Sequence, residues 1–279
     1  MNHVTNKKSY GAAAVRDGAK LQYTVHGTEQ AGQPRIALVH SLGMSGAVWD
    51  GVVEHLAPRA LVLTYDCRGH GASTKSPAPY LLETFANDLA DLLTHVGWSS
   101  AHVAGGSLGG SVALQFAALF PERTQTLGLI DTTAWYGPEG AKNWEARAQD
   151  AEQKGLQPLV PIQHTRWFSD HFRAEHPDLV APCTSVFLAN DVACFAATCR
   201  MLGSFDLRSM LGALRIPAAI MVGEEDSATP VAMSREMESG IAGATLQIIS
   251  KARHLTFVER PDVIAQALTQ LMQRVAAPV

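Results

Sequence analysis

Short apolar segments alternate with amphipathic segments along most of the chain. Arg35–His40, Leu61–Asp66 and Ala218–Val222 are apolar runs of strand length. Glu83–Val96 instead carries apolar residues at helical spacing and stops at Gly97. Continuous apolar strands are typical of a parallel sheet that helices cover on both faces. The pattern therefore predicts an α/β fold with a mostly parallel central sheet and helices on both faces.

The remaining segments extend this alternation. Arg16-Asp17-Gly18 separates two apolar runs near the start and predicts a β-hairpin. Further strands are expected at Ala101–Ala104, Thr126–Ile130 and Thr245–Ile249, and further helices at Ala47–Leu56, Leu108–Phe120, Pro230–Ile241 and Pro261–Val275.

The alternation breaks after Asp131 and resumes after about Leu214. Between these points no strand-like run is bounded by turns, and the helical stretches are rich in aromatic residues. They are expected at Trp144–Gln153, Thr165–Phe172, Val180–Leu188 and Val192–Leu202. We interpret this segment as a helical cap inserted between two strands. The predicted organisation is a core formed by 11–133 and 215–275, with a cap at 134–214.

Composition and charge exclude several classes of protein. The chain has 279 residues, of which 47% are hydrophobic and 17% charged, as in an ordinary globular domain. Its net charge is -4 and it has no long basic run, so we expect no nucleic-acid partner. Its apolar stretches are shorter than the roughly 18 residues that cross a bilayer, so we expect no membrane segment.

The N-terminal segment and the cysteines bear on location. Met1–Ser9 is polar and lacks the apolar region of a signal peptide. The four cysteines form no CxxC pair and no zinc-binding spacing. We expect free thiols in a cytoplasmic protein, with no metal and no organic cofactor.

Gly105-Gly106-Ser107-Leu108-Gly109 is the strongest chemical signal in the sequence. It follows a strand and opens a helix, which is the context of a G-x-S-x-G nucleophile turn. A phosphate-binding loop is the alternative, but it requires GxGxxG or GxxxxGK[ST], and neither pattern fits. Ser107 is therefore the expected nucleophile.

A serine hydroxyl needs a base to take its proton. In this fold the acid and the histidine follow the nucleophile in that order along the chain. Asp226 follows the Ala218–Val222 strand, and His254 follows the Thr245–Ile249 strand. Both loops leave the carboxyl ends of strands, so they are expected at the same sheet edge as Ser107. His254 is the expected base and Asp226 its acid partner; the neighbouring Glu224 and Glu225 are interpreted as solvated loop charges.

Two backbone amides are expected to bind the oxyanion of a tetrahedral intermediate. One is the N–H of Leu108, directly after the nucleophile. The other is the N–H of Leu42, in the loop that follows the Arg35–His40 strand.

At this point the sequence resembles the α/β-hydrolase superfamily, and within it the 3-oxoadipate enol-lactonases. The matching stretches are His40-Ser41-Leu42-Gly43 with Trp49, Tyr65-Asp66-Cys67-Arg68-Gly69-His70-Gly71-Ala72-Ser73, Ser107-Leu108-Gly109-Gly110, Pro121-Glu122-Arg123, Asp131-Thr132-Thr133-Ala134-Trp135, Arg166-Trp167-Phe168, and His254 before Glu259-Arg260-Pro261. The resemblance covers about Leu21 to Leu271. We interpret Asp66, Arg68 and His70 as structural. One departure is Gly106, where the lactonases usually carry a larger apolar residue.

The resemblance implies a serine hydrolase that opens a small lactone or ester, with 3-oxoadipate enol-lactone of aromatic-compound catabolism as the expected substrate. Other chemistry on this scaffold stays open: a different small ester, C–C bond hydrolysis of a ring-cleavage product, or cofactor-free haloperoxidase activity. Dehalogenases and epoxide hydrolases need an aspartate in place of Ser107. A receptor that has lost turnover is the alternative outside enzymes.

The cap is expected to choose the substrate. A 3-oxoadipate-type lactone carries a free carboxylate, which suits an arginine. The cap arginines are Arg147, Arg166, Arg173 and Arg200, and Arg166 is the candidate. Pairing with an acidic residue or stacking on an aromatic ring is the alternative for Arg166. Trp135, Trp144, Trp167 and Phe168 are candidate pocket walls, although packing between cap and core is the stronger explanation for any one of them taken singly.

Overall fold

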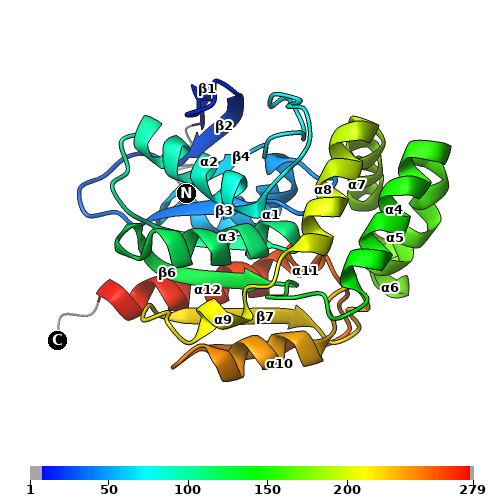
Figure 1. Cartoon of the computed structure of the whole chain (residues 1–279). Coiled ribbons are helices and arrows are strands. Elements are labelled where there is room, and N and C mark those ends of the chain that lie inside the picture. Colours follow the sequence, from blue (N-terminus) through cyan, green and yellow to red (C-terminus); the bar gives the residue numbers. More distant parts are fainter. Residues whose placement is uncertain (1–7, 277–279) are drawn as a thin grey trace.

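The computed structural model describes residues 8–276, which contain one eight-stranded sheet (Figure 1). The strand order is β1-β2-β4-β3-β5-β6-β7-β8. β1 pairs with β2 and β2 with β4 antiparallel, and every other pair is parallel. The predicted α/β class with a mostly parallel sheet is therefore confirmed. The strands are β1 Lys8–Ala14, β2 Lys20–His26, β3 Arg35–Val39, β4 Leu61–Tyr65, β5 Ala101–Gly106, β6 Thr124–Ile130, β7 Ala218–Gly223 and β8 Thr245–Ile249.

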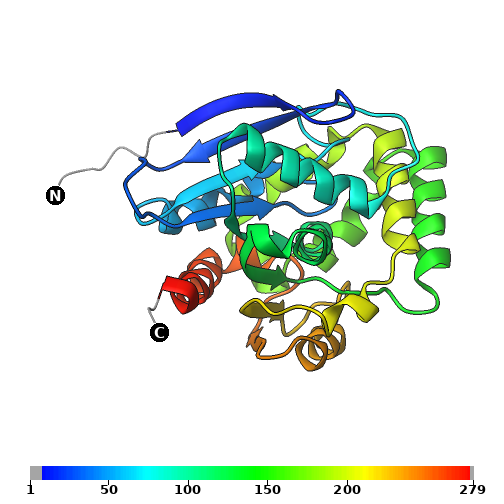
Figure 2. The ribbon, with the colours of Figure 1, turned by 60° about the vertical axis from the view of Figure 1, so that its left-hand side comes forward.

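Helices cover both faces of this sheet. α1 and α12 pack together on one face, and α2 and α3 pack together on the other (Figures 1 and 2). The helices are α1 Asp50–Leu56, α2 Leu82–His95, α3 Leu108–Leu119, α4 Gly140–Lys154, α5 Val160–Trp167, α6 Asp170–Glu175, α7 Pro177–Leu188, α8 Val192–Ser204, α9 Arg208–Leu211, α10 Val231–Gly240, α11 Thr256–Glu259 and α12 Pro261–Ala276; short 3₁₀ turns occupy Gly46–Trp49, Pro121–Arg123 and Gln157–Leu159.

The central strands are inaccessible to solvent from both sides. Every residue of β4, β5 and β7 is buried, as their continuous apolar sequences predict. β8 is an edge strand with one buried residue, Ile249. The carboxyl ends of the parallel strands point toward a group of helices at one end of the sheet (Figure 1). Loops that leave these strand ends therefore meet at one edge.

The chain between β6 and β7 forms α4 to α9. Of these, α4 to α8 make up this group and we call them the cap helices, whereas α9 lies beside the start of β7 (Figure 1). α4 packs along α8. The cap boundaries at 134 and 214 remain a prediction. The single helix expected over Thr165–Phe172 is wrong, because the chain is extended at Phe168, with φ -132° and ψ 143°. The Ser169 hydroxyl accepts the N–H of Phe172 and caps a new helix, α6.

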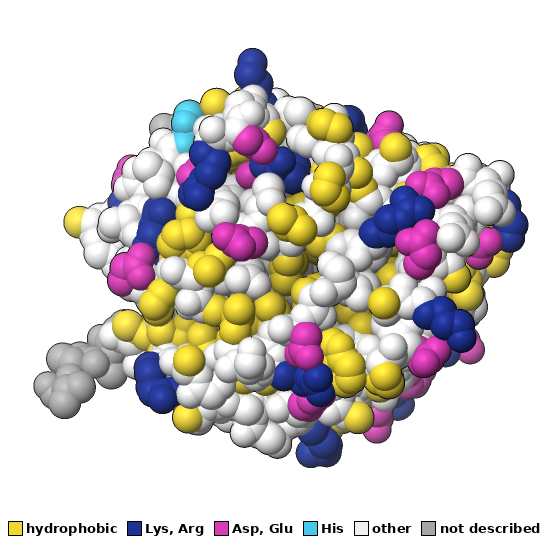
Figure 3. Space-filling view, viewed as in Figure 1, with side chains coloured by type: hydrophobic (Ala, Val, Ile, Leu, Met, Phe, Trp, Pro, Cys, Tyr) yellow, Lys and Arg dark blue, Asp and Glu magenta, His cyan; other side chains and the backbone are white. Residues whose placement is uncertain are grey.

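The surface and the thiols complete the description. On the face shown in Figure 3, acidic and basic side chains are intermixed. Within residues 8–276 no single helix is long and apolar enough to cross a membrane; α7 and α8 meet that test only as a pair, bent by 97°. The four cysteines are free and buried. The expectation that the N-terminal segment is not a signal peptide rests mainly on residues 1–7, which lie outside the described residues.

The turn after β4 is held by hydrogen bonds and an ion pair of its polar side chains, in keeping with the structural role expected for it. Asp66 accepts the N–H groups of Gly46 and Ala72, each at 2.8 Å. Arg68 forms a two-pronged ion pair with Asp88 of α2, with both N–O distances 2.6 Å. The exposed fractions of these two side chains are 5% and 3%. The pair therefore ties the turn to α2 from inside the protein.

We expect Asp88→Asn to lower the free energy of unfolding by about 3 kcal/mol, because it leaves the Arg68 charge buried without its main partner. Asp91→Asn is the matched control on the same helix. It breaks the Arg16–Asp91 pair, in which Arg16 is 53% exposed, and should cost about 1 kcal/mol or less. Urea denaturation measures both values. Equal losses in the two variants would contradict the structural role of the Arg68–Asp88 pair.

Candidate active site

Ser107 occupies a sharp turn between β5 and α3. Its backbone has φ 53° and ψ -118°, a region that non-glycine residues seldom adopt. A Cβ at Gly105 would lie 2.0 Å from the Gly109 carbonyl oxygen, and one at Gly109 would lie 2.0 Å from the Val39 carbonyl oxygen. Only glycine fits at both positions, so the glycines of the motif allow the turn that lifts Ser107 above the sheet edge.

The three residues predicted as a triad lie together. The Ser107 hydroxyl Oγ is 2.8 Å from His254 Nε2. On the other side of the ring, His254 Nδ1 is 2.8 Å from Asp226 Oδ2. All three residues are buried. The geometry allows a proton to pass from Ser107 to an imidazole that a carboxylate orients.

Asp226 is fixed by the loop that follows β7. Its Oδ1 accepts the N–H groups of Ala228 and Thr229 at 2.7 and 3.0 Å, and its Oδ2 accepts the Thr229 hydroxyl at 2.8 Å. Burial alone would raise the pKa of Asp226, but His254 and these hydrogen bonds outweigh it and lower the pKa below its ordinary value. Glu224 and Glu225 are exposed, as expected for solvated loop charges.

Opposing effects act on the pKa of His254. Burial lowers it, but the Asp226 carboxylate, which is charged and hydrogen-bonded to the ring, raises it, and the net pKa lies above the ordinary 6.5. Arg166 acts in the opposite direction and weakens this rise. The buried His40 and His70 differ, because burial lowers their pKa values to about 4 and about 3. His254 is thus set apart by its carboxylate partner.

A second buried carboxylate, Asp131, joins the loops of the site and was not identified as a site residue from the sequence. It follows β6 with φ 46°. Its Oδ1 accepts the Gly223 N–H at 3.0 Å, and its Oδ2 accepts the N–H and hydroxyl of Thr256 at 2.9 and 2.6 Å. Burial raises the pKa of Asp131 well above its ordinary value, and the nearby charge of Asp226 adds to this rise. Asp131 therefore links the end of β7 to the loop that carries His254.

The two predicted oxyanion amides flank the nucleophile in the chain topology. Leu42 lies in the loop after β3, and Leu108 is the first residue of α3. β3 is the neighbour of β5 in the sheet, so the Leu42 loop emerges beside Ser107. Neither amide donates a hydrogen bond to another group in the described part of the chain. Neither residue is among those that line the cavity described next, and the role of both amides stays a prediction.

A cavity of about 470 Å³ opens above Ser107 and His254. Its core wall comes from the loops after β5, β7 and β8, and its opposite wall comes from cap helices α4 and α5. Its lining residues are Ser107, Tyr136, Gly140, Asn143, Trp144, Ala146, Arg147, Asp150, Leu159, Ile162, Arg166, Ser227, Ala228, Pro230, Met233 and His254. The cavity lies between cap and core, which is where the sequence predicts a substrate.

Three of the predicted pocket residues do not line this cavity. The Arg208 guanidinium lies 3.6 Å from the ring centre of Trp135 and covers it. Trp167 packs edge-on against Phe187, and Phe168 stacks on Phe172. Both rings are buried. The expectation that Trp135, Trp167 and Phe168 form the cavity wall is therefore not met, because each ring packs within the protein; Trp144 does line the cavity.

The backbone of Arg166-Trp167-Phe168 contacts the loop that carries His254. The carbonyl of Arg166 accepts the His254 N–H at 3.3 Å, and the carbonyl of Trp167 accepts the Leu255 N–H at 3.0 Å. Arg253 Nη1 donates to the Phe168 carbonyl at 3.1 Å. We call 165–169 the docking segment. It attaches the cap to the loop that carries His254.

The four cap arginines fall into two groups. Arg200 pairs with Glu145 and Glu152 at 2.8 and 2.7 Å, and Arg173 pairs with Asp170. Arg147 and Arg166 line the cavity instead, and neither has an acidic partner among the described residues. Burial lowers the pKa of Arg147, and the charge of Arg166 lowers it further. Two like charges held close together in one cavity favour an anionic ligand.

Gly106, the departure noted in the sequence, faces an aromatic ring. A Cβ at Gly106 would lie 2.4 Å from Phe257. Phe257 is fully buried and packs on Trp49, with 4.4 Å between ring centres. The volume that a larger residue at 106 would take is therefore filled by Phe257, and the pocket floor is not enlarged.

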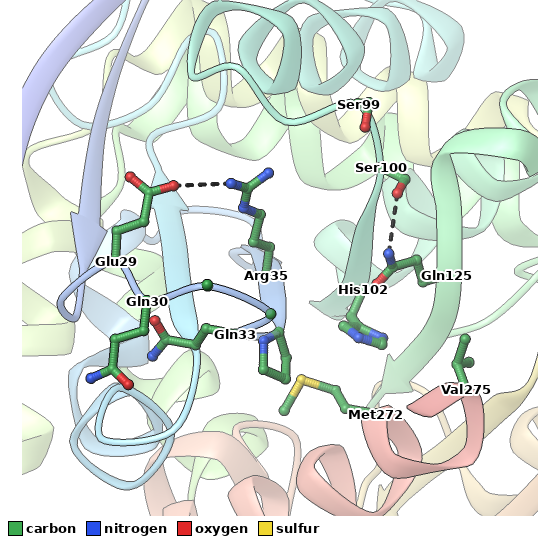
Figure 4. Close-up of a pocket in the computed structure, with 13 residues that line it drawn as sticks. Glu29, Gln30, Gln33, Arg35, Ser99, Ser100, His102, Gln125, Met272 and Val275 are labelled. Atoms are coloured by element: carbon green, nitrogen blue, oxygen red, sulfur yellow. Dashed lines mark hydrogen bonds and ion pairs between the residues drawn. The ribbon is translucent and has the colours of Figure 1, made fainter. Parts of the chain in front are cut away.

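A second hollow lies near the amino ends of the central strands, away from the triad (Figure 4). A Glu29–Arg35 ion pair of 3.0 Å and a Gln125–Ser100 hydrogen bond of 3.1 Å line it. Its histidine, His102, bonds to the Thr126 hydroxyl at 2.9 Å rather than to a nucleophile with an acid partner. Across residues 8–276, no group of three or more His, Cys, Asp or Glu side chains is placed to hold a metal ion.

We expect the imidazole of His254 to titrate with a pKa above 6.5, and Asp226→Asn to lower that pKa because the variant removes the charge that stabilises the imidazolium. Proton NMR of the imidazole resonances measures both values, and His254→Ala identifies the resonance by its absence. An unchanged His254 pKa in Asp226→Asn would contradict the proposed pairing.

Comparison with known proteins agrees with this architecture. The family model described as the alpha/beta hydrolase fold matches residues 34–261. The 3-oxoadipate enol-lactonase 2 of Acinetobacter baylyi is 31% identical over 254 residues, which is 91% of this chain and 93% of that protein. A putative carbamate hydrolase of Azorhizobium caulinodans is 29% identical, covering 90% of this chain and 94% of that protein.

A solved structure gives the same result. The crystal structure of the enol-lactonase from Burkholderia xenovorans LB400 superposes with a TM-score of 0.90 at 30% identity, covering 94% of this chain and all of that one. The predicted resemblance to the α/β hydrolases and to the enol-lactonases is confirmed. The chain belongs to the α/β hydrolase fold family and is an enzyme of that family.

Proposed function

We propose that this protein hydrolyses the ester bond of a small lactone or ester through Ser107, His254 and Asp226. The observation that carries the proposal is the continuous chain of two 2.8 Å contacts from Ser107 through His254 to Asp226 at the floor of a cavity. A binding protein has no need for this arrangement of nucleophile, base and acid. The reaction requires no metal and no organic cofactor.

In the first half of the reaction, His254 Nε2 takes the proton of Ser107 as Oγ attacks the carbonyl carbon. The N–H groups of Leu42 and Leu108 stabilise the oxyanion. The intermediate collapses, the C–O bond to the leaving oxygen breaks, and His254 returns the proton to that oxygen. In the second half, His254 takes a proton from the water that attacks the acyl carbon, the bond from that carbon to Ser107 Oγ breaks, and His254 returns the proton to Ser107 as the acid is released. Asp226 stabilises the imidazolium in both halves.

The substrate class follows from the two arginines without acidic partners. A carboxylate in the cavity would pair with Arg147 and Arg166, neither of which forms an ion pair with another described residue. A small lactone that carries a free carboxylate fits a volume of about 470 Å³. The names of the enol-lactonase relatives point to the same class. We therefore propose 3-oxoadipate enol-lactone as the first substrate to test, and a small-molecule partner in a cytoplasmic aromatic-degradation pathway.

Carbamate hydrolysis is the second candidate. The putative carbamate hydrolase is 29% identical, close to the 30% of the second enol-lactonase. A carbamate carbonyl forms the same kind of tetrahedral oxyanion, so the same residues would serve.

The central test compares wild type with Ser107→Ala on 3-oxoadipate enol-lactone, a small carbamate and a p-nitrophenyl ester. Loss of the nucleophile should lower kcat by about 10³-fold or more. Absorbance follows the lactone and the ester, and released ammonia follows the carbamate. Ser107-dependent ester cleavage without lactone turnover would remove the pathway assignment and keep the hydrolase. Equal rates in both proteins would overturn the role of Ser107.

We expect Arg166→Ala and Arg147→Ala each to lower kcat/KM for a carboxylated substrate by about 10- to 100-fold, because each removes a charge-assisted hydrogen bond. The loss should be small for an uncharged ester of the same size. Arg200→Ala is the matched control, since Arg200 pairs with Glu145 and Glu152 and does not line the cavity. Less than a threefold loss on the carboxylated substrate would exclude carboxylate recognition by that arginine.

A further inference from the structure

Tyr136 is the one tyrosine among the residues that line the cavity, and it has no part in the scheme above. It lies in the segment between β6 and α4 and lines the same cavity as Ser107 and His254. Nothing in the triad or the oxyanion amides accounts for a phenol at this position.

The ring of Tyr136 is held by packing on two sides. It meets the ring of Trp144 edge-on, with centres 5.1 Å apart and planes at 80°. It meets Phe205 in the same manner, at 5.8 Å and 65°. The backbone next to it is fixed by a bridge between Trp135 and Asp206. A hydroxyl on a ring with so little freedom is preorganised toward one point in the cavity.

The sheet order places the segment that carries Tyr136 on one side of the nucleophile. Ser107 follows β5, and the Leu42 loop follows β3 on one side of β5. Tyr136 follows β6 on the other side, where β7 and β8 supply Asp226 and His254. The oxyanion is predicted to form on the Leu42 side, so the segment that carries Tyr136 reaches the cavity from the side of the base, where a leaving group would depart.

The protonation state of Tyr136 suits a donor. Burial raises the pKa of its phenol above the ordinary value, and the charge of Asp226 raises it further, whereas Arg147 lowers it. The phenol is therefore protonated at neutral pH. It can donate a hydrogen bond to an oxygen that gains negative charge.

Building on the proposed serine hydrolysis, we propose that Tyr136 is a further catalytic residue that donates a hydrogen bond to the leaving oxygen as the ester C–O bond breaks. The proton that the leaving oxygen receives is the one His254 took from Ser107, and Tyr136 keeps its own. By microscopic reversibility, the water that attacks the acyl-enzyme occupies the same position and contacts the same hydroxyl.

This role makes the benefit of the hydroxyl depend on the leaving group. A p-nitrophenolate disperses its charge and leaves with little help. An alkoxide concentrates its charge on one oxygen and gains more from a second donor. Tyr136 thus favours esters and lactones of poorly acidic alcohols.

The test is Tyr136→Phe, which keeps the ring against Trp144 and Phe205 and removes only the hydroxyl. We compare kcat/KM, which reports bond cleavage before the acyl-enzyme, for acetate esters of p-nitrophenol, phenol, trifluoroethanol and ethanol. The acyl group is constant, so only the leaving oxygen changes. The loss should be under about threefold for the p-nitrophenyl ester and rise to about tenfold or more for the ethyl ester.

Tyr80→Phe is the control for the loss of a tyrosine hydroxyl elsewhere. Tyr80 donates to the Ser76 carbonyl at 2.8 Å and does not line the cavity, so its variant should match wild type on every ester. A loss in Tyr136→Phe that is equal for all leaving groups, or no loss at all, would overturn the inference while Ser107-dependent turnover stands. Turnover that survives in Ser107→Ala would overturn the proposed function and this inference together.

Discussion

The strained turn at Ser107 is the constraint on which the site depends. A positive φ at a serine persists only where the surroundings enforce it. Here β5 and α3 pack so closely that a Cβ atom at Gly105 or Gly109 would collide with a backbone carbonyl oxygen. Because β5 is central in the sheet, this turn has a neighbouring strand on each side. One neighbour supplies the loop with the Leu42 amide, and the other leads to Tyr136. The chemistry therefore gathers around a single strained residue that the sheet holds in the middle.

Much of this arrangement could be predicted from the sequence, because it rests on local rules. The apolar runs indicate buried parallel strands, and the G-x-S-x-G motif, Asp226 and His254 each follow such a run. The structure brings those three residues together for the reason the pattern suggests: parallel strands end at one edge. The prediction of a single helix over Thr165–Phe172 was wrong, because hydrophobic periodicity does not reveal that Ser169 caps a new helix.

The remaining site residues depend on long-range packing. Trp167 and Phe168 belong to a recognisable motif, yet their rings are buried and their backbone carries the contacts. The sequence did not single out Tyr136, because nothing local shows which ring of an aromatic-rich segment lines the cavity. Asp131 follows a strand, a position that could have marked it as a site residue. Its partners Gly223 and Thr256 are far away in the sequence, so its hydrogen bonds could not be predicted. Likewise, only the structure separates Arg200, which forms ion pairs, from Arg147 and Arg166, which form none within residues 8–276.

The docking segment has a consequence for how a substrate enters. The carbonyls of Arg166 and Trp167 hold the backbone of His254 and Leu255, and the side chain of Arg166 faces the cavity. A cap that swung away as a lid would break these hydrogen bonds and release the general base at the same time. Substrate entry by such an opening would therefore displace His254, whereas a small molecule that enters the cavity directly would leave the docking segment in place.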